Sequence, residues 1–237
     1  MWWSRWIGVV MALAPAGPAA GCDLALVLAV DVSGSVDARE YRLQMDGLAA
    51  ALRDPVVSEA LVRAEAQVLL LQWSGTGRQK ITIPWTKITG FAEIDALADR
   101  VAQDQRIWRN YSTAVGEALL VGLEAFGRAG PCARRLIDLS GDGPSNEGVE
   151  PAELRPLLRA AGVTVNAIAI EQSVPDLTAY YFENVITGEG AFVVTAAGFA
   201  DYPDRIRRKL LREVSQRSSA LAPGPGAGDV TIRDHGN

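Results

Sequence analysis

The sequence predicts an α/β fold in which a mainly parallel central sheet carries helices on both faces. Apolar runs typical of buried strands alternate along the chain with stretches whose apolar residues recur at helical spacing. Two of these runs, 24–30 and 134–139, lead directly into acidic loops that contain glycine. The 237 residues, 49% of them hydrophobic, suit one domain of roughly 200 residues.

Six segments have the composition of strands, being short, apolar and bounded by turn residues. The third alternates and contains Pro84, which suits an edge strand, here expected to run antiparallel to its neighbour. Strands are predicted over 24–30, 66–73, 79–85, 134–139, 163–170 and 191–195.

Six further segments have the periodicity of amphipathic helices. The pair Asp54-Pro55 is expected to end the first, and Gly162 the fourth. The basic stretch 205–212 suits the C-terminal half of the last helix. Helices are predicted over 37–52, 91–101, 113–129, 150–161, 176–185 and 199–216.

The two ends of the chain are expected to lie outside this domain, which we place at 22–217. Arg5, the apolar stretch 6–13 and the small residues that follow it have the order of a secretory signal peptide over 1–21. That apolar stretch is shorter than the about 20 residues that span a bilayer, and no later transmembrane segment is predicted. The protein is therefore expected to be exported, to the periplasm or the cell exterior. The Ala/Pro/Gly-rich end, 218–237, predicts a disordered tail.

The chain has two cysteines, Cys22 and Cys132, an even count that suggests a disulfide in an exported protein. Cys22 could instead be the lipidated first residue of a lipoprotein, although residues 19–21 fit that weakly. Nine residues separate Cys22 from Asp31, and ten separate Cys132 from Asp142. If the two strands are parallel neighbours, the cysteines meet at one end and the aspartates at the other, which favours the disulfide.

Composition and motifs argue against several functions. The net charge of −5 gives no indication of a nucleic-acid partner. The one histidine, His235, lies in the predicted tail, which argues against a Ser-His-Asp or Cys-His catalytic system and against a His/Cys zinc site. Neither a Walker loop nor a dinucleotide-binding glycine pattern is present. Ser33 stands where an aspartyl-phosphate phosphatase would have a second aspartate.

The segment Asp31-Val32-Ser33-Gly34-Ser35 places a carboxylate and two hydroxyls where the first strand runs into a loop. These are hard oxygen ligands, the type that Mg²⁺ prefers, and Gly34 would let the loop fold tightly around an ion. The alternative is purely structural, with Ser35 or Asp37 capping the next helix.

Asp142 is a second carboxylate at the end of a predicted strand. In parallel α/β sheets, ligands bind beyond the carboxyl ends of the strands, which is where Asp31 also lies. Asp138, within the same strand, could orient the metal-binding loop or could be a satisfied buried acid. Asn146, shortly after Asp142, is interpreted as a turn residue.

Three motifs in order resemble those of von Willebrand factor type A (vWA) domains: the segment 31–35, Thr113 before a helix, and Asp142-Gly143. The resemblance extends over roughly 24–216 and is strongest to a bacterial group of short exported proteins of uncharacterised function. It implies a three-layer, Rossmann-like vWA fold with a mainly parallel sheet, one antiparallel edge strand and helices on both faces.

The resemblance also implies a metal-ion-dependent adhesion site (MIDAS) for Mg²⁺ or Mn²⁺. Hydroxyls of Ser33, Ser35 and Thr113 would bind the ion, with Asp31 and Asp142 supplying charge directly or through waters. An open position would then capture an Asp or Glu of a partner protein, a binding rather than an enzymatic function. Structurally, Ser112 or Thr113 could instead cap a helix. A metal-assisted hydrolase or phosphotransferase on the same scaffold is the alternative function.

Overall fold

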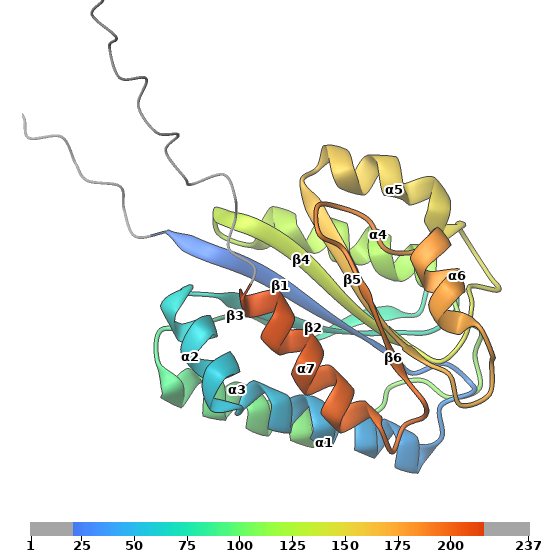
Figure 1. The fold of residues 1–237 in the computed structure, drawn as a ribbon, viewed down its shortest axis with the longest axis horizontal. Coiled ribbons are helices and arrows are strands. Elements are labelled where there is room, and N and C mark those ends of the chain that lie inside the picture. Colours follow the sequence, from blue (N-terminus) through green and yellow to red (C-terminus); the bar gives the residue numbers. More distant parts are fainter. Residues whose placement is uncertain (1–20, 216–237) are drawn as a thin grey trace, which may run out of the picture.

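The computed structural model describes residues 21–215, which form one six-stranded sheet between two layers of helices (Figure 1). The strand order is β3-β2-β1-β4-β5-β6, and only β3 runs antiparallel to its neighbour. The strands are β1 (Cys22–Asp31), β2 (Gln67–Trp73), β3 (Gln79–Lys87), β4 (Cys132–Gly141), β5 (Val163–Ile170) and β6 (Val193–Ala196).

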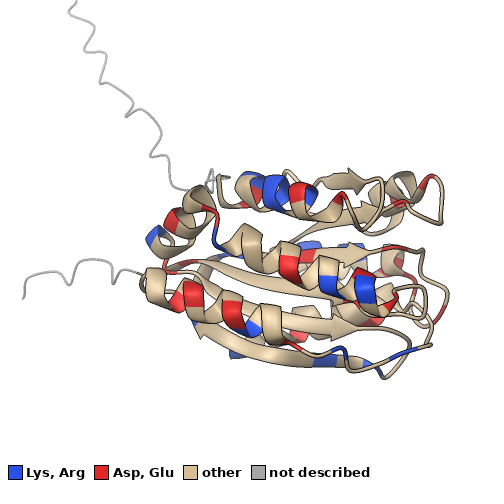
Figure 2. Cartoon of the chain, turned by 90° about the horizontal axis from the view of Figure 1, so that it is seen from below, with Lys and Arg blue, Asp and Glu red and all other residues tan. Residues whose placement is uncertain are grey.

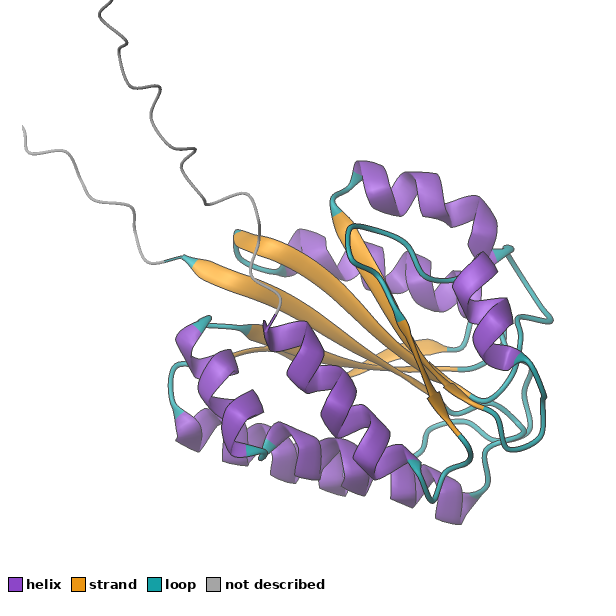
Figure 3. Cartoon of the chain, viewed as in Figure 1, coloured by secondary structure: helices purple, strands orange, loops and turns teal. Residues whose placement is uncertain are grey.

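Helices α1, α2, α3 and α7 lie on one side of the sheet, and α4, α5 and α6 lie on the other (Figure 3). This is the predicted three-layer arrangement, with the predicted antiparallel edge strand. The helices are α1 (Ala38–Leu52), α2 (Pro55–Arg63), α3 (Phe91–Gln103), α4 (Val115–Ala125), the 3₁₀ helix η1 (Phe126–Arg128), α5 (Pro151–Ala160), α6 (Leu177–Asn184) and α7 (Tyr202–Ser215).

The apolar run of β1 is nearly continuous because both faces of this strand are buried. Leu26 and Leu28 pack into the core beneath α1, α3 and α7, whereas Val27 and Ala29 pack into the core beneath α4, α5 and α6. Charged side chains lie mostly on the helices and the loops (Figure 2). The sheet is therefore a rigid central layer from which loops project at both ends.

Helix α2 was not predicted. The pair Asp54-Pro55 does end α1, but it also starts a new helix, because proline fits the first helical position. The Asp54 carboxylate accepts hydrogen bonds from the main-chain N–H groups of Val56 and Val57, at 2.9 and 3.3 Å. The prediction of a helix over 113–129 was too long at both ends, since α4 covers only Val115–Ala125.

The disulfide between Cys22 and Cys132 is present. The two cysteines are direct partners in the β1–β4 register, at the amino ends of both strands. At the other end Val30 pairs with Ser140, so Asp31 lies abreast of Gly141 and Asp142 follows one residue later. The unequal spacings of nine and ten residues are thereby explained.

Replacing both cysteines with serine is expected to lower the free energy of unfolding by about 2–5 kcal/mol. The bond closes a loop between residues 110 positions apart, and such a loop removes much conformational entropy from the unfolded chain. Urea denaturation would measure the loss. Reductant should weaken the wild-type protein to a similar degree and leave the double variant unchanged; a loss below about 1 kcal/mol would contradict this account.

A buried cluster of polar and charged side chains joins α7 to the sheet. Its members are Asp138, Lys209, Glu213 and Asn166, all with at most 1% exposure. The Lys209 Nζ lies 2.6 Å from Asp138 Oδ1 and 2.6 Å from Glu213 Oε1. Asn166 donates to the same glutamate oxygen at 2.9 Å. Burial and the charge of Asp138 raise the pKa of Glu213 to about 8, against the opposing effects of Lys209 and Asn166. Burial therefore favours the protonated form of Glu213.

The variant Glu213→Gln is expected to match the wild type near pH 4.5 and to exceed its stability at pH 9. Because the native pKa of Glu213 lies above its ordinary value of 4.5, the native state binds the proton more tightly than the unfolded chain does. Wild-type stability from this group is thus complete below pH 4.5 and is lost as the pH rises to about 8. We expect a gap on the order of 2–4 kcal/mol at pH 9, measured by urea denaturation. The control Glu189→Gln, at an exposed position, should show no such gap in stability at pH 9. If the stabilities of Glu213→Gln and the wild type had the same pH dependence, the raised pKa of Glu213 would be contradicted.

Within residues 21–215, no helix is long and apolar enough to cross a membrane. The predicted signal peptide, the predicted tail and His235 lie outside the described residues, except for Gly21 at the boundary.

Candidate metal-binding site

The carboxyl ends of β1 and β4 lie side by side, and the chain runs outward from them in opposite directions along the sheet. Such a point, where the strand order reverses, is where α/β sheets bind ligands. The loops that gather at this end of the sheet are seen at the right of Figure 3. Asp31 is the last residue of β1, and Asp142 directly follows β4.

Asp31 is buried, with 1% exposure. Its Oδ1 accepts a hydrogen bond from the main-chain N–H of Ser33 at 2.7 Å. Its Oδ2 is also buried and has no hydrogen-bond partner among the described residues. Leaving a carboxylate oxygen buried and unpaired is costly, so this oxygen is suited to face a cation.

The hydroxyls of Ser33 and Ser35 lie 3.2 Å apart, and Ser35 Oγ donates to Asp142 Oδ1 at 2.7 Å. This bond joins the loop after β1 to the end of β4. Ser35 does not cap α1, because Asp37 is the N-cap residue and forms a capping box with Glu40. The Ser35 hydroxyl is thus directed to the site rather than to the helix.

Thr113 precedes α4 by two residues and is buried, with 6% exposure. Its main-chain N–H donates to Asn146 Oδ1 at 2.9 Å, and its carbonyl accepts from the Asn146 N–H at 2.9 Å. Helix α4 has no side-chain cap, so neither Ser112 nor Thr113 has the alternative capping role. The Thr113 hydroxyl lies 4.0 Å from the position that a Cβ on Gly143 would take, beside Asp142.

Two tyrosines of α6 hold the loop after β4. The Tyr181 hydroxyl donates to the carbonyl of Gly143 at 3.0 Å, and the Ser145 N–H donates to the Tyr180 hydroxyl at 3.2 Å. Tyr181 is fully buried beneath the site. A Cβ on Gly141 would lie only 2.3 Å from the Tyr181 hydroxyl, so the glycine is needed for this close approach. These contacts were not predicted, since the tyrosines come from a distant helix.

Electrostatics at the site favour binding of a cation. Burial, followed by the charge of Asp142, raises the pKa of Asp31 to about 7. Burial also raises the pKa of Asp142, which the hydrogen bond from Ser35 partly offsets. Two buried like charges repel each other, and a divalent cation between them would remove that repulsion.

The donor set decides which metals fit. Among residues 21–215, no group of three or more His, Cys, Asp or Glu side chains is placed to hold a metal ion. An ion here would therefore rely on the hydroxyls of Ser33, Ser35 and Thr113 beside two carboxylates. These are oxygen donors only, which suits Mg²⁺ or Mn²⁺. The unpaired Asp31 Oδ2 and the neighbouring hydroxyls of Ser33 and Ser35 fit such an ion.

Asp138 does not belong to this site. Its carboxylate pairs with Lys209 in the buried cluster beneath α7, and no hydrogen bond among the described residues joins it to the loop after β1. It is a buried acid paired with Lys209 through Oδ1, while its Oδ2 has no hydrogen-bond partner among the described residues. Asn146 stays a loop residue, and its contact is with the Thr113 main chain.

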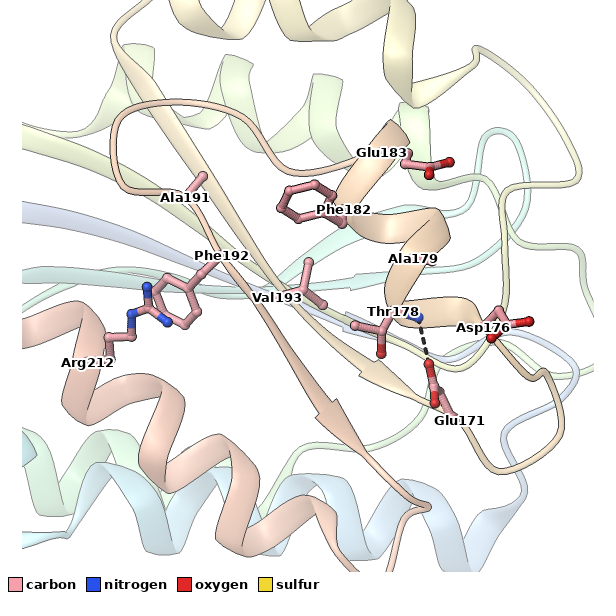
Figure 4. Close-up of a pocket in the computed structure, with 10 residues that line it drawn as sticks. All are labelled: Glu171, Asp176, Thr178, Ala179, Phe182, Glu183, Ala191, Phe192, Val193 and Arg212. Carbon is pink, nitrogen blue, oxygen red and sulfur yellow. Dashed lines mark hydrogen bonds between the residues drawn. The ribbon is translucent and has the colours of Figure 1, made fainter.

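A separate pocket of about 640 Å³ opens beside α6, β6 and the start of the β5–α6 loop (Figure 4). Phe182 and Phe192 lie on its wall, and the Arg212 guanidinium stacks 3.7 Å above the Phe192 ring. Glu171 accepts from the Thr178 N–H at 2.7 Å. The pocket shares none of the five candidate metal-site residues.

Solved structures similar to this one include vWA domain proteins. They include a zinc-occupied MIDAS structure of mussel byssus proximal thread matrix protein 1 (18% identity, 82% of this chain and 46% of that chain, TM-score 0.58). A von Willebrand factor type A structure from Catenulispora acidiphila matches at 16% identity (81% and 43%, TM-score 0.57). An aerotolerance-related membrane protein from Bacteroides fragilis NCTC 9343 matches at 12% (81% and 98%, TM-score 0.53). The match spans less than half the length of the first two.

The fold is that of a vWA domain, as the three sequence motifs predicted. No curated protein matches the chain. The chain belongs to the family described as "Protein of unknown function (DUF1194)", whose model matches residues 21–218.

Proposed function

We propose that this protein is an exported, metal-ion-dependent binding module. Mg²⁺ or Mn²⁺ would be held by the hydroxyls of Ser33, Ser35 and Thr113, with Asp31 and Asp142 supplying charge. The observation that carries this is the junction of the two strand ends, where Ser35 bonds to Asp142 while Asp31 keeps a buried, unpaired oxygen. The zinc-occupied MIDAS of the mussel protein supports it by analogy of fold.

The bound ion would capture a carboxylate of a partner protein. Three of its five protein donors would be neutral hydroxyls, so the two carboxylates only balance a divalent charge. Mg²⁺ prefers six oxygens in octahedral array and keeps several waters, one of which an Asp or Glu can replace. We place the protein in the periplasm or outside the cell on the N-terminal sequence pattern and the disulfide.

Thr113→Val is expected to weaken Mg²⁺ binding more than tenfold (~1.4 kcal/mol or more), because one oxygen ligand is lost while the side-chain volume is nearly kept. Isothermal titration would measure this. Thr86→Val, at a half-buried position on the edge strand β3, is the matched control and should bind like the wild type. Equal Mg²⁺ affinity in all three proteins would remove Thr113 from the site.

The same pair of variants can test capture of a partner. An envelope protein retained by the wild type and by Thr86→Val in Mg²⁺, released by EDTA and missed by Thr113→Val would support the proposal. Retention that EDTA leaves unchanged would contradict a metal-bridged contact. Turnover of phosphoesters that requires Mg²⁺ and is lost in Thr113→Val would instead favour the hydrolase or phosphotransferase.

A further inference from the structure

The segment between α3 and α4 passes over the loop that carries Ser33 and Ser35. The Gly34 N–H donates to the Tyr111 carbonyl at 2.8 Å. A Cβ built on Gly34 would lie 3.2 Å from that carbonyl oxygen and 3.3 Å from Asn110 Cα. Residues 110–111 therefore form one wall of the candidate metal site.

Arg106, in the same segment, forms hydrogen bonds with the main chain of the loop that carries Ser33 and Ser35. Its Nη2 donates to the carbonyls of Ser33 and Val32, at 2.7 and 3.1 Å. Its Nε is buried and has no hydrogen-bond partner among the described residues. Burial and the charge of Arg109 lower the pKa of Arg106, while the charge of Asp31 raises it. Arg106 and Arg109 are thus close enough to repel each other beside the site.

Arg109 is exposed and makes no hydrogen bond or ion pair within residues 21–215. Two residues further along the chain, the ring of Tyr111 is 42% exposed and has the Arg78 guanidinium stacked 3.7 Å above it. We call Arg78, Arg106 and Arg109 the arginine rim. Arg106 and Arg109 belong to the segment that passes over the loop carrying Ser33, and Arg78 is joined to that segment through Tyr111.

Acidic residues at the start of α1 also border the site, and the charge of Asp37 acts on Arg106. Glu40 and Asp37 form the capping box of α1, and Gln172 donates to Glu40 at 2.5 Å. The charge of Glu40 contributes to the raised pKa of Asp142, so it acts on the metal site itself. An acidic ligand would therefore be directed to the arginine rim and away from Glu40.

We propose that the arginine rim selects a protein segment that carries a second acidic side chain a few residues from the carboxylate held by the metal. This inference rests on the proposed carboxylate capture. Arg109 would pair with the second carboxylate, and its planar guanidinium can bind both oxygens at once. The incoming charge would also relieve the repulsion between Arg109 and Arg106. Because the pair would be exposed to water, its effect on affinity is moderate and sensitive to salt.

Capped synthetic peptides test this on the full domain in Mg²⁺, with affinities measured by NMR titration. One peptide has a single glutamate among glycines and serines, and the others add a second glutamate at spacings of one to four residues. At least one two-acid peptide should bind the wild type about threefold to tenfold more tightly than the single-acid peptide. Arg109→Gln should lose this preference. Arg128→Gln, exposed in η1 at the opposite end of the sheet, should keep it.

The outcomes separate this inference from the function it rests on. If single-acid binding depends on Mg²⁺ but no two-acid peptide binds more tightly, or if Arg109→Gln keeps the preference, the arginine-rim inference is wrong and carboxylate capture stands. If the peptides fail to bind in Mg²⁺, or bind equally in EDTA, both proposals are overturned. Raising the salt concentration should reduce the two-acid preference more than the single-acid affinity.

Discussion

Replacing Lys209 with methionine is expected to lower the free energy of unfolding by about 3–5 kcal/mol. The Lys209 ammonium lies 2.6 Å from a carboxyl oxygen of each of two buried acids, Asp138 and Glu213. Methionine keeps most of the side-chain length but leaves buried acids without a partner. Because α7 is bound to the sheet through this contact, the loss should appear as a shift of the main unfolding transition in urea.

The matched control is Lys80→Met, at an exposed position on the edge strand β3, which should change stability by less than about 1 kcal/mol. Adding Asp138→Asn to Lys209→Met should recover part of the loss, since it removes one of the unpaired charges. If Lys209→Met lowered the free energy of unfolding no more than the control does, the ion pairs of Lys209 would not stabilise the fold.

Asp31→Asn is expected to make the metal-free protein more stable and to abolish its stabilisation by Mg²⁺. At pH 8, above its pKa of about 7, Asp31 is an ionised carboxylate buried beside Asp142. Removing its charge in EDTA should raise the free energy of unfolding, on the order of 1–3 kcal/mol. In Mg²⁺ at 100 times its dissociation constant, the wild type should gain about 2.7 kcal/mol and the variant almost nothing.

Urea denaturation of the wild type and of Asp31→Asn, each in EDTA and in Mg²⁺, gives the four free energies of unfolding to compare. Asp95→Asn, on the exposed surface of α3, serves as the control and should respond to Mg²⁺ like the wild type. If Asp31→Asn lost stability in EDTA and still responded to Mg²⁺, Asp31 would be an ordinary structural acid. A gain in stability in EDTA together with a lost response to Mg²⁺ is typical of a residue retained for binding rather than for folding.

Most of the fold could be predicted because the central strands are buried on both faces. The run 24–30 is almost entirely apolar for this reason, and the runs of β1, β4 and β5 are each followed by a helix. Helix α2 could not be recognised from the same signals, because Asp54-Pro55 is both a stop signal for one helix and a start signal for the next. Its nine residues follow α1 with only two residues between them.

The candidate site was predictable only where its residues form local motifs. Asp31, Ser33 and Ser35 lie within five positions, and Asp142 directly follows a strand whose cysteine marks the register. Tyr180 and Tyr181, and likewise Arg106, reach the site from elements far along the chain. A tyrosine pair in a helix or an arginine in a loop has no spacing that indicates its contact, so only the tertiary fold reveals these supports.

The most direct test of the central claim is a crystal structure of the protein with Mn²⁺, using anomalous scattering to locate the ion. The account predicts one strong peak beyond the carboxyl ends of β1 and β4, within about 2.5 Å of at least two of the hydroxyl oxygens of Ser33, Ser35 and Thr113. The peak should be lost in Thr113→Val and kept in Thr86→Val. A well-occupied Mn²⁺ elsewhere, with none between Asp31 and Asp142, would contradict the account.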